Sequence, residues 1–349
     1  MVMKNLSEFY KNKKVFVTGH TGFKGSWLCE VLLHFGANVK GYALKANTEP
    51  ALFEVSGLAA RMNSVIADIR DLARLQKEIA DFQPDIVLHL AAQPLVRESY
   101  KAPVVTYETN VMGTVNLLEA CRGVSSIKSI VNVTTDKVYE NKEWEWGYRE
   151  HERLCGFDPY SNSKSCSELV THSYKNCFYN MSDSPALSTA RSGNVIGGGD
   201  FSTDRIIPDC VSAAVADREI VVRNPHSTRP YQHVLECLRG YLLLAALQYE
   251  DKSYAGNYNF GPDDESCVAT GVLVDLFCKK WRGAKWVNKS DNGPHEANFL
   301  KLDCAKAKKI LGWYPVLDIE RAISLTTEWS MAYYKGKNII GEQIKKYFG

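Results

Sequence analysis

The sequence lacks the features that mark several large classes of protein. Its ten cysteines include no C-x-x-C pair, which argues against a zinc ribbon or a disulfide framework. No apolar run approaches the ~20 residues that cross a bilayer, and the first residues carry no apolar core of a signal peptide. The formal net charge is only +2, so no basic excess points to nucleic acid or a membrane surface. We therefore expect a cytoplasmic protein with free thiols, no metal, no nucleic-acid partner and no membrane association.

Over the first 190 residues, short β-rich runs alternate with longer helical patterns. The expected strands are 14–18, 38–43, 64–67, 86–90, 127–134 and 187–192. This alternation is typical of a parallel sheet covered by helices on both faces. After Asn194 the pattern changes to glycines and prolines between shorter apolar runs. We predict an α/β fold, with a doubly wound Rossmann-type parallel sheet in residues 1–190 and a smaller mixed α/β substrate-binding lobe in residues 191–349. Some segments of the C-terminal half are expected to return to the first domain.

Three glycines with a regular spacing follow the first expected strand. Gly19, Gly22 and Gly25 form G-x-x-G-x-x-G between the apolar residues 15–17 and the helical pattern 27–33. Backbone N–H groups at a helix N-terminus bind phosphate, and glycine lets the backbone approach closely. The spacing differs from the commoner G-x-G-x-x-G, and a plain tight turn is the alternative. The placement between strand and helix favours a dinucleotide site at this turn.

A tyrosine and a lysine open a later helical pattern at i, i+4 spacing. Tyr160 and Lys164 lie on one face of that helix. A lysine cation lowers the pKa of a nearby phenol, and the phenolate can take a proton from an alcohol while a nicotinamide takes the hydride. An ordinary tyrosine beside a solvated lysine is the alternative. Thr135, at the end of the fifth expected strand, supports the catalytic interpretation.

Together these motifs resemble the extended short-chain dehydrogenase/reductases, the family of nucleotide-sugar epimerases and dehydratases. The resemblance covers nearly the whole chain and rests on Val17–Gly19, His89–Gln93, Asn110–Thr114, Thr135, Tyr160, Lys164 and Arg191–Gly197. Thr135 followed by Asp136 is similar to the sugar-nucleotide 4,6-dehydratases, most of which have Glu next. This chain has Lys137, and its Thr-Asp-Lys with the segment 20–25 is most similar to the branch that acts on CDP-glucose.

The resemblance implies a role for each matching residue. The implied catalytic residues are Thr135, Asp136, Lys137, Tyr160 and Lys164. Those implied to bind NAD are Gly19, Thr21, Gly22, Phe23, Lys24, Gly25, Asp68, Ile69, Leu90, Ala91, Ala92, Gln93, Tyr160 and Lys164. Asn194 and Arg229 are implied to hold the substrate diphosphate, with His295 near the nucleotide. The second expected strand ends at Ala43 without the usual acid, and Lys45 follows, so NADP stays an alternative to NAD.

The resemblance also implies a substrate, an assembly and a pathway. The substrate is CDP-glucose or a similar nucleotide sugar, and the product would serve deoxysugar synthesis for the O-antigen of lipopolysaccharide. A homodimer is implied, built from the helices expected at 107–121 and 160–179. The alternatives are a dTDP- or GDP-linked 4,6-dehydratase, a UDP-sugar 4-epimerase, a reductase that consumes NADPH, and a non-catalytic binding module. Asp136 and Lys137 argue against an epimerase, because epimerisation needs no acid at C6.

Overall fold

The computed structural model describes residues 5–289 and 299–349 and is built on a seven-stranded parallel sheet. The strands are β1 (Lys14–Thr18), β2 (Asn38–Ala43), β3 (Asn63–Ile66), β4 (Ile86–His89), β5 (Ser129–Val133), β6 (Ala186–Arg191) and β11 (Asn257–Asn259). Six of them lie within two residues of the expected strands, which confirms the doubly wound prediction. The seventh, β11, was not expected; it pairs with β6 through Tyr258 and Ala190.

The order of the strands fixes where a ligand can bind. It runs β11-β6-β5-β4-β1-β2-β3, so the direction of winding reverses between β1 and β4. Val17 of β1 pairs with Leu88 of β4 on one side and with Gly41 of β2 on the other. In open parallel sheets, ligands bind at the carboxyl ends of the strands beside such a reversal.

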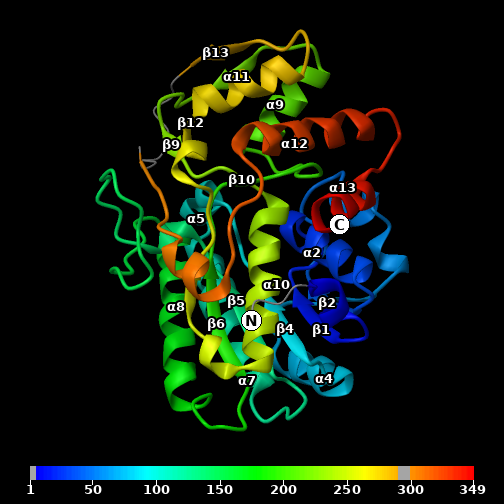
Figure 1. Cartoon of the computed structure of the whole chain (residues 1–349), viewed down its shortest axis with the longest axis vertical. Coiled ribbons are helices and arrows are strands. Elements are labelled where there is room, and N and C mark those ends of the chain that lie inside the picture. Colours follow the sequence, from blue (N-terminus) through cyan, green and yellow to red (C-terminus); the bar gives the residue numbers. More distant parts are fainter. Residues whose placement is uncertain (1–4, 290–298) are drawn as a thin grey trace.

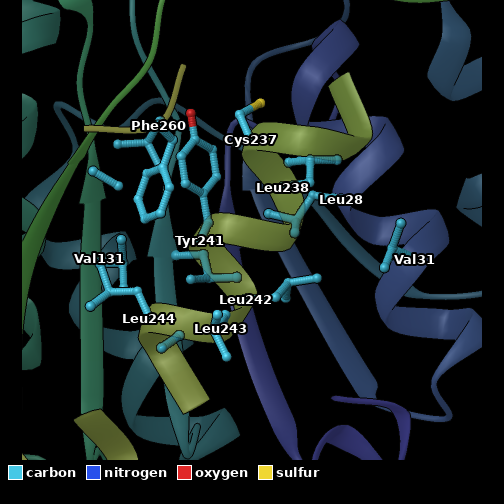
Figure 2. Close-up of a cluster of buried hydrophobic side chains, with 14 of the residues drawn as sticks. Leu28, Val31, Val131, Cys237, Leu238, Tyr241, Leu242, Leu243, Leu244 and Phe260 are labelled. Atoms are coloured by element: carbon cyan, nitrogen blue, oxygen red, sulfur yellow. The ribbon is translucent and has the colours of Figure 1, made fainter. Parts of the chain in front are cut away.

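Helices cover both faces of the sheet (Figure 1). On one face lie α2 (Phe23–His34) and α10 (Val234–Glu250), and on the other lie α4 (Leu72–Phe82), α7 (Gly113–Cys121) and α8 (Pro159–Cys177). Figure 2 shows Leu28 of α2, Leu238 of α10 and Val131 of β5 in the core between α10 and the sheet. α10 is therefore a buried helix, and the Tyr241 hydroxyl and the Cys237 sulfur on it lie toward the same end of this cluster (Figure 2).

The helix expected at 107–121 begins earlier and is interrupted. α6 (Pro103–Tyr107) starts at a proline, a π-helical turn follows over Glu108–Met112, and α7 comes next. The π turn carries Asn110, whose side chain accepts from the Gln93 backbone N–H and donates to the Ser163 hydroxyl. A regular pattern of apolar residues cannot reveal such a local change of helix type.

A smaller lobe has its own core and lies above the sheet in Figure 1. Its helices are α9 (Ile206–Val215), α11 (Thr270–Lys280) and α12 (Ile319–Tyr333), and its core includes Ile207, Phe277 and Ile323. Its short strands pair two by two: β7 (Val195–Ile196) with β10 (Gln232–His233), β9 (Thr228–Arg229) with β12 (Val268–Ala269), and β8 (Ile220–Val222) with β13 (Trp286–Asn288).

The remaining helices are short or terminal. They are α1 (Leu6–Tyr10), α3 (Leu52–Val55), α5 (Val96–Lys101) and α13 (Ile340–Phe348), with 3-10 turns at Leu58–Ala60, Asp136–Val138, Lys252–Tyr254 and Asp264–Ser266 and a second π turn at Ala307–Leu311. α13 packs against α2, so the end of the chain returns to the sheet domain. The domain boundary after residue 190 stays a prediction. None of the helices in the described ranges has the length and apolar character needed to cross a membrane.

Candidate active site

The glycine turn joins β1 to α2 and touches the segment that follows β4. Gly19 has a φ of +78°, and a Cβ there would lie 2.7 Å from the backbone nitrogen of Ala91. A Cβ on Gly25 would collide with the Gly19 carbonyl, which explains the third glycine. The turn is thus pressed against the chain at the reversal point between β1 and β4, and only glycine permits that approach.

The N-terminus of α2 has the properties of an anion site. α2 begins at Phe23, and its N-cap Gly22 supplies no side-chain hydrogen bond to the first turn. Gly22 itself is exposed. The first-turn N–H groups and the helix dipole therefore face the space next to the glycine turn, as the diphosphate of a dinucleotide requires. These residues fit the implied cofactor.

Other residues predicted to bind the cofactor surround this turn. The hydroxyl of Thr21 donates to the Leu44 carbonyl at 2.8 Å, tying the turn to the end of β2. Ile69 follows β3 and is buried against Gly113. Arg70 pairs with Asp68, and this hydrogen bond lowers the pKa of the Asp68 carboxyl. The segment Leu90–Gln93 follows β4, as expected.

The catalytic residues predicted after β5 lie on a short 3-10 turn. Thr135 caps this turn, and its hydroxyl donates to Asp136 Oδ1 at 2.9 Å. Asp136 is 1% exposed, and its second oxygen, Oδ2, has no hydrogen-bond partner among the described residues. Lys137 is half-buried beside it. The strand has ended before Asp136, so the two neighbouring side chains are free of the strict alternation of a strand.

Tyr160 and Lys164 lie on the first turns of α8, directly beside this turn. The Tyr160 phenol is hydrogen-bonded to Thr135, but burial is the larger effect and raises its pKa to about 12. The low phenol pKa that the sequence led us to expect is therefore not found in this state of the chain, because burial outweighs the neighbouring charges. The Lys164 ammonium donates to the Val133 carbonyl at 3.0 Å. Burial, helped by the charge of Lys24, lowers the Lys164 pKa to about 8.

The Lys24 side chain extends from the glycine turn into the same site. Its ammonium donates to the Ser192 hydroxyl at 3.4 Å, and it lies 5.8 Å from the centre of the Tyr241 ring. Burial lowers its pKa, and Asp136 is close enough to oppose that shift. The sequence placed Lys24 in the cofactor loop only, whereas its charge also reaches Asp136 and Lys164.

The predicted diphosphate residues begin the smaller lobe. Asn194 follows β6 with a φ of +42°, and its carbonyl accepts from the Gln232 backbone N–H at 3.3 Å. Arg229 is buried on β9, three residues before Gln232. The hydrogen bond from Gln232 to Asn194 thus brings the segment of Arg229 next to that of Asn194. His295 lies outside the described residues.

The sequence reasoning missed several residues that shape the site. Glu168 lies one turn beyond Lys164 and forms a buried ion pair with Arg191; its i, i+4 spacing from Lys164 was a usable signal. Arg205 pairs with Asp200 at 3.0 Å, and its charge acts on the Tyr160 phenol. No local pattern predicts Arg205, because the lobe must fold before this side chain reaches Tyr160.

The comparisons with known proteins agree with this geometry. The profile of a family described as GDP-mannose 4,6 dehydratase matches residues 16–326. A CDP-glucose 4,6-dehydratase of Salmonella typhimurium is 48% identical over 97% of this chain and 96% of its own length. A dTDP-glucose 4,6-dehydratase of Streptomyces antibioticus is 27% identical over 95% of each chain. A solved structure, the UDP-glucuronic acid 4-epimerase of Bacillus cereus in complex with UDP-glucuronic acid and NAD, superposes with a TM-score of 0.79 at 23% identity, covering 92% of this chain and 100% of that one.

Proposed function

The chain belongs to the GDP-mannose 4,6-dehydratase family, and we propose that it converts CDP-D-glucose into CDP-4-keto-6-deoxy-D-glucose and water. The 48% identity to the Salmonella enzyme supports the CDP-linked substrate. The observation that carries the proposal is the placement of Asp136 and Lys137 on the turn after β5, beside the Thr135 that bonds Tyr160. This pair supplies an acid and a base in addition to those that oxidation at C4 needs.

We assign NAD as the cofactor, held by the glycine turn and the N-terminus of α2. When bound, NAD would supply a hydride acceptor for C4 and, once reduced, the hydride donor for C6, so no external reductant would be consumed. Lys45 is exposed after β2, where an acid would usually hold the adenosine ribose. The internal redox cycle favours NAD over NADP, and the Bacillus cereus structure contains NAD.

In the oxidation step, Tyr160 takes the proton of the sugar 4-hydroxyl. Thr135 holds the phenol by a hydrogen bond, and Lys164 holds the start of α8 against β5 through the Val133 carbonyl. Because burial raises the Tyr160 pKa to about 12, the phenolate needs nearby positive charge. Arg205 provides such charge, because it lowers the phenol pKa, and we propose that the neighbouring Lys164 adds to it.

In the elimination step, the 4-ketone makes the C5 hydrogen acidic. Lys137, in its neutral form, takes this proton, and Asp136, in its protonated form, donates to the 6-hydroxyl as it leaves as water. The C5–H and C6–O bonds break, a C5=C6 double bond forms, and one water is released. Lys137 gives its proton back to C5 as C6 is reduced, and the proton that Tyr160 took balances the one that Asp136 gave to water. Asp136 Oδ2, buried and without a described partner, is the oxygen available for this transfer.

Asn194 and Arg229 are proposed to bind the substrate diphosphate. The buried Arg229 guanidinium has the planar donors that suit paired phosphate oxygens. The role of His295 near the nucleotide remains a proposal from the resemblance.

An epimerase is the main alternative, because solved structures of similar fold include epimerases. At identities of 21 to 23%, these structures support a shared fold but not a shared activity. The Asp136–Lys137 pair favours a dehydratase. The test is incubation of the enzyme and NAD with CDP-, dTDP-, GDP- and UDP-glucose in turn, measuring the alkali-induced absorbance of a 4-keto-6-deoxy sugar. A signal with CDP-glucose is expected; a CDP-linked C4 epimer without that signal would overturn the proposal.

We also propose a homodimer formed through α6–α7 and α8. Large apolar side chains on these helices are exposed, including Val104, Met112 and Leu169 at 67%, 50% and 56%, and pairing into a four-helix bundle would bury them. Sedimentation at micromolar concentration should give a dimer, and a monomer would contradict it. We also propose a cytoplasmic location, which the composition led us to expect, and a place in O-antigen deoxysugar synthesis, which the resemblance implies.

A further inference from the structure

A buried hydrogen-bond network lies directly behind the turn that carries Asp136 and Lys137. Tyr139 follows that turn and is 2% exposed. Its hydroxyl donates to Asn259 Oδ1 at 2.7 Å and accepts from Arg191 Nη1 at 2.8 Å. The Arg191 guanidinium also lies 5.1 Å from the centre of the Tyr139 ring. A side chain that makes three such contacts has little freedom to move.

Arg191 is fully buried, and its charge is balanced by Glu168. Its Nε and Nη2 each donate to a Glu168 oxygen at 2.8 Å, a paired geometry, and Nη1 also donates to the Glu150 carbonyl at 2.9 Å. Glu168 in addition accepts from the hydroxyls of Thr134 and Thr189. A buried ion pair with its oxygens and nitrogens this fully bonded is a rigid support.

The network joins three segments that each carry a group of the site. Tyr139 follows the turn of Asp136 and Lys137, Arg191 ends β6 three residues before Asn194, and Glu168 lies one turn beyond Lys164 on α8. Tyr139 links the end of the catalytic turn to Arg191 and, through Arg191, to Glu168.

We propose that Tyr139 is a positioning residue for the elimination step, with its hydroxyl fixing the turn of Asp136 and Lys137 against the end of β6. This inference rests on the proposed dehydratase function. The oxidation groups are held without it: Lys164 bonds the Val133 carbonyl, and Glu168 bonds Thr134 and Thr189. Loss of the Tyr139 hydroxyl should therefore act on elimination and spare oxidation.

Tyr148 provides a matched control. Its ring stacks on that of Tyr139, with centroids 5.2 Å apart and an interplanar angle of 16°, and both rings are 2% exposed. The Tyr148 hydroxyl bonds instead to the Asn141 side chain and the Lys142 backbone N–H. Tyr139→Phe and Tyr148→Phe thus remove the same atom from two stacked, buried rings, and only the first removes a bond to Arg191.

The experiment compares the wild type, Tyr139→Phe and Tyr148→Phe in single turnovers with NAD and CDP-glucose. It follows reduced-nicotinamide absorbance and the 4-keto-6-deoxy product, with a thermal melt of each protein. We expect Tyr139→Phe to form bound NADH at a rate within about threefold of the wild type. We expect it to lose water about tenfold or more slowly, so that NADH accumulates. Tyr148→Phe should be within about threefold of the wild type in both steps.

Each other outcome contradicts the inference. Normal elimination in Tyr139→Phe would overturn it, as would equal losses in both variants or an equal loss of oxidation and elimination in Tyr139→Phe. A wild type that forms no 4-keto-6-deoxy product from CDP-glucose would instead refute the proposed function, so the two failures are distinguishable.

Discussion

The Asp136 carboxylate occupies the space that a side chain on Gly193 would fill. A Cβ on Gly193 would overlap both carboxylate oxygens of Asp136, although the two residues lie on different strand ends. The glycine has no positive φ that would require it for the backbone. Its absence of a side chain therefore serves the position of the catalytic acid.

Replacing this glycine should displace the acid without removing it. In Gly193→Ala the methyl group forces the Asp136 side chain away, and a displacement near 1 Å of a catalytic group costs ~10²-fold in rate. Elimination should therefore fall by ~10²-fold, while bound NADH still forms; stopped-flow absorbance with CDP-glucose measures both.

Gly341→Ala is the control, because a Cβ there meets nothing within 4 Å. It should leave both steps unchanged. A Gly193→Ala enzyme with normal elimination would show that the fit between Gly193 and Asp136 is irrelevant to catalysis.

Tyr160→Phe tests the oxidation base. The change removes the proton acceptor and the hydrogen bond to Thr135 but little packing volume. Folding and NAD binding should survive, and turnover should fall by ~10²–10⁴-fold. Steady-state product formation and NAD titration of the same preparation provide the measurement; near-normal turnover would rule out Tyr160 as the base.

The buried Lys164 should make stability depend on pH above neutrality. Its pKa falls from 10.5 to about 8 in the folded chain, mainly through burial, so the unfolded chain binds more protons between these values. The free energy of unfolding therefore rises with pH across this window. The destabilisation caused by burying the charged lysine is fully present below pH 8. Relative to Lys164→Met, the wild type should gain up to roughly 3 kcal/mol between pH 8 and 10.5.

Urea unfolding of both proteins across this pH range measures the difference, since other titrating groups are common to both. The exposed Lys45, replaced by Met, serves as the control and should leave the slope of the wild type unchanged. Parallel stability curves for the wild type and Lys164→Met would contradict the lowered pKa.

The sheet could be predicted from the sequence because its buried strands are apolar runs bounded by turn residues. β11 was not predicted because Asn257–Asn259 is a three-residue edge strand with two asparagines. The π turn at Glu108–Met112 was not predicted because a change of helix type leaves no periodic signal of its own in the sequence. Such elements depend on the segments that they pack against, and a local sequence pattern holds no information about those segments.

The site could be predicted where its functional residues lie close together in the sequence. The glycine turn and the Tyr160–Lys164 spacing needed only a strand and a helix to place them. The pKa of Tyr160 was mispredicted because burial, a property of the whole fold, outweighs the neighbouring charges. The close fit of Asp136 against Gly193 and the Tyr139–Arg191 hydrogen bond each join residues far apart in sequence. Neither could therefore be predicted.

The central claim is that Lys137 takes the C5 proton while Asp136 protonates the leaving 6-hydroxyl. The most direct measurement is the reduced-nicotinamide absorbance in a single turnover of Lys137→Ala with NAD and CDP-glucose, with the exposed Lys142→Ala as control. The account predicts that NADH forms and persists in Lys137→Ala, with the 4-keto-glucose nucleotide retained and no water lost, while the control completes the reaction. Dehydration at the wild-type rate would contradict the role of Lys137 as base, and the absence of any NADH signal would move Lys137 to the oxidation step or to binding.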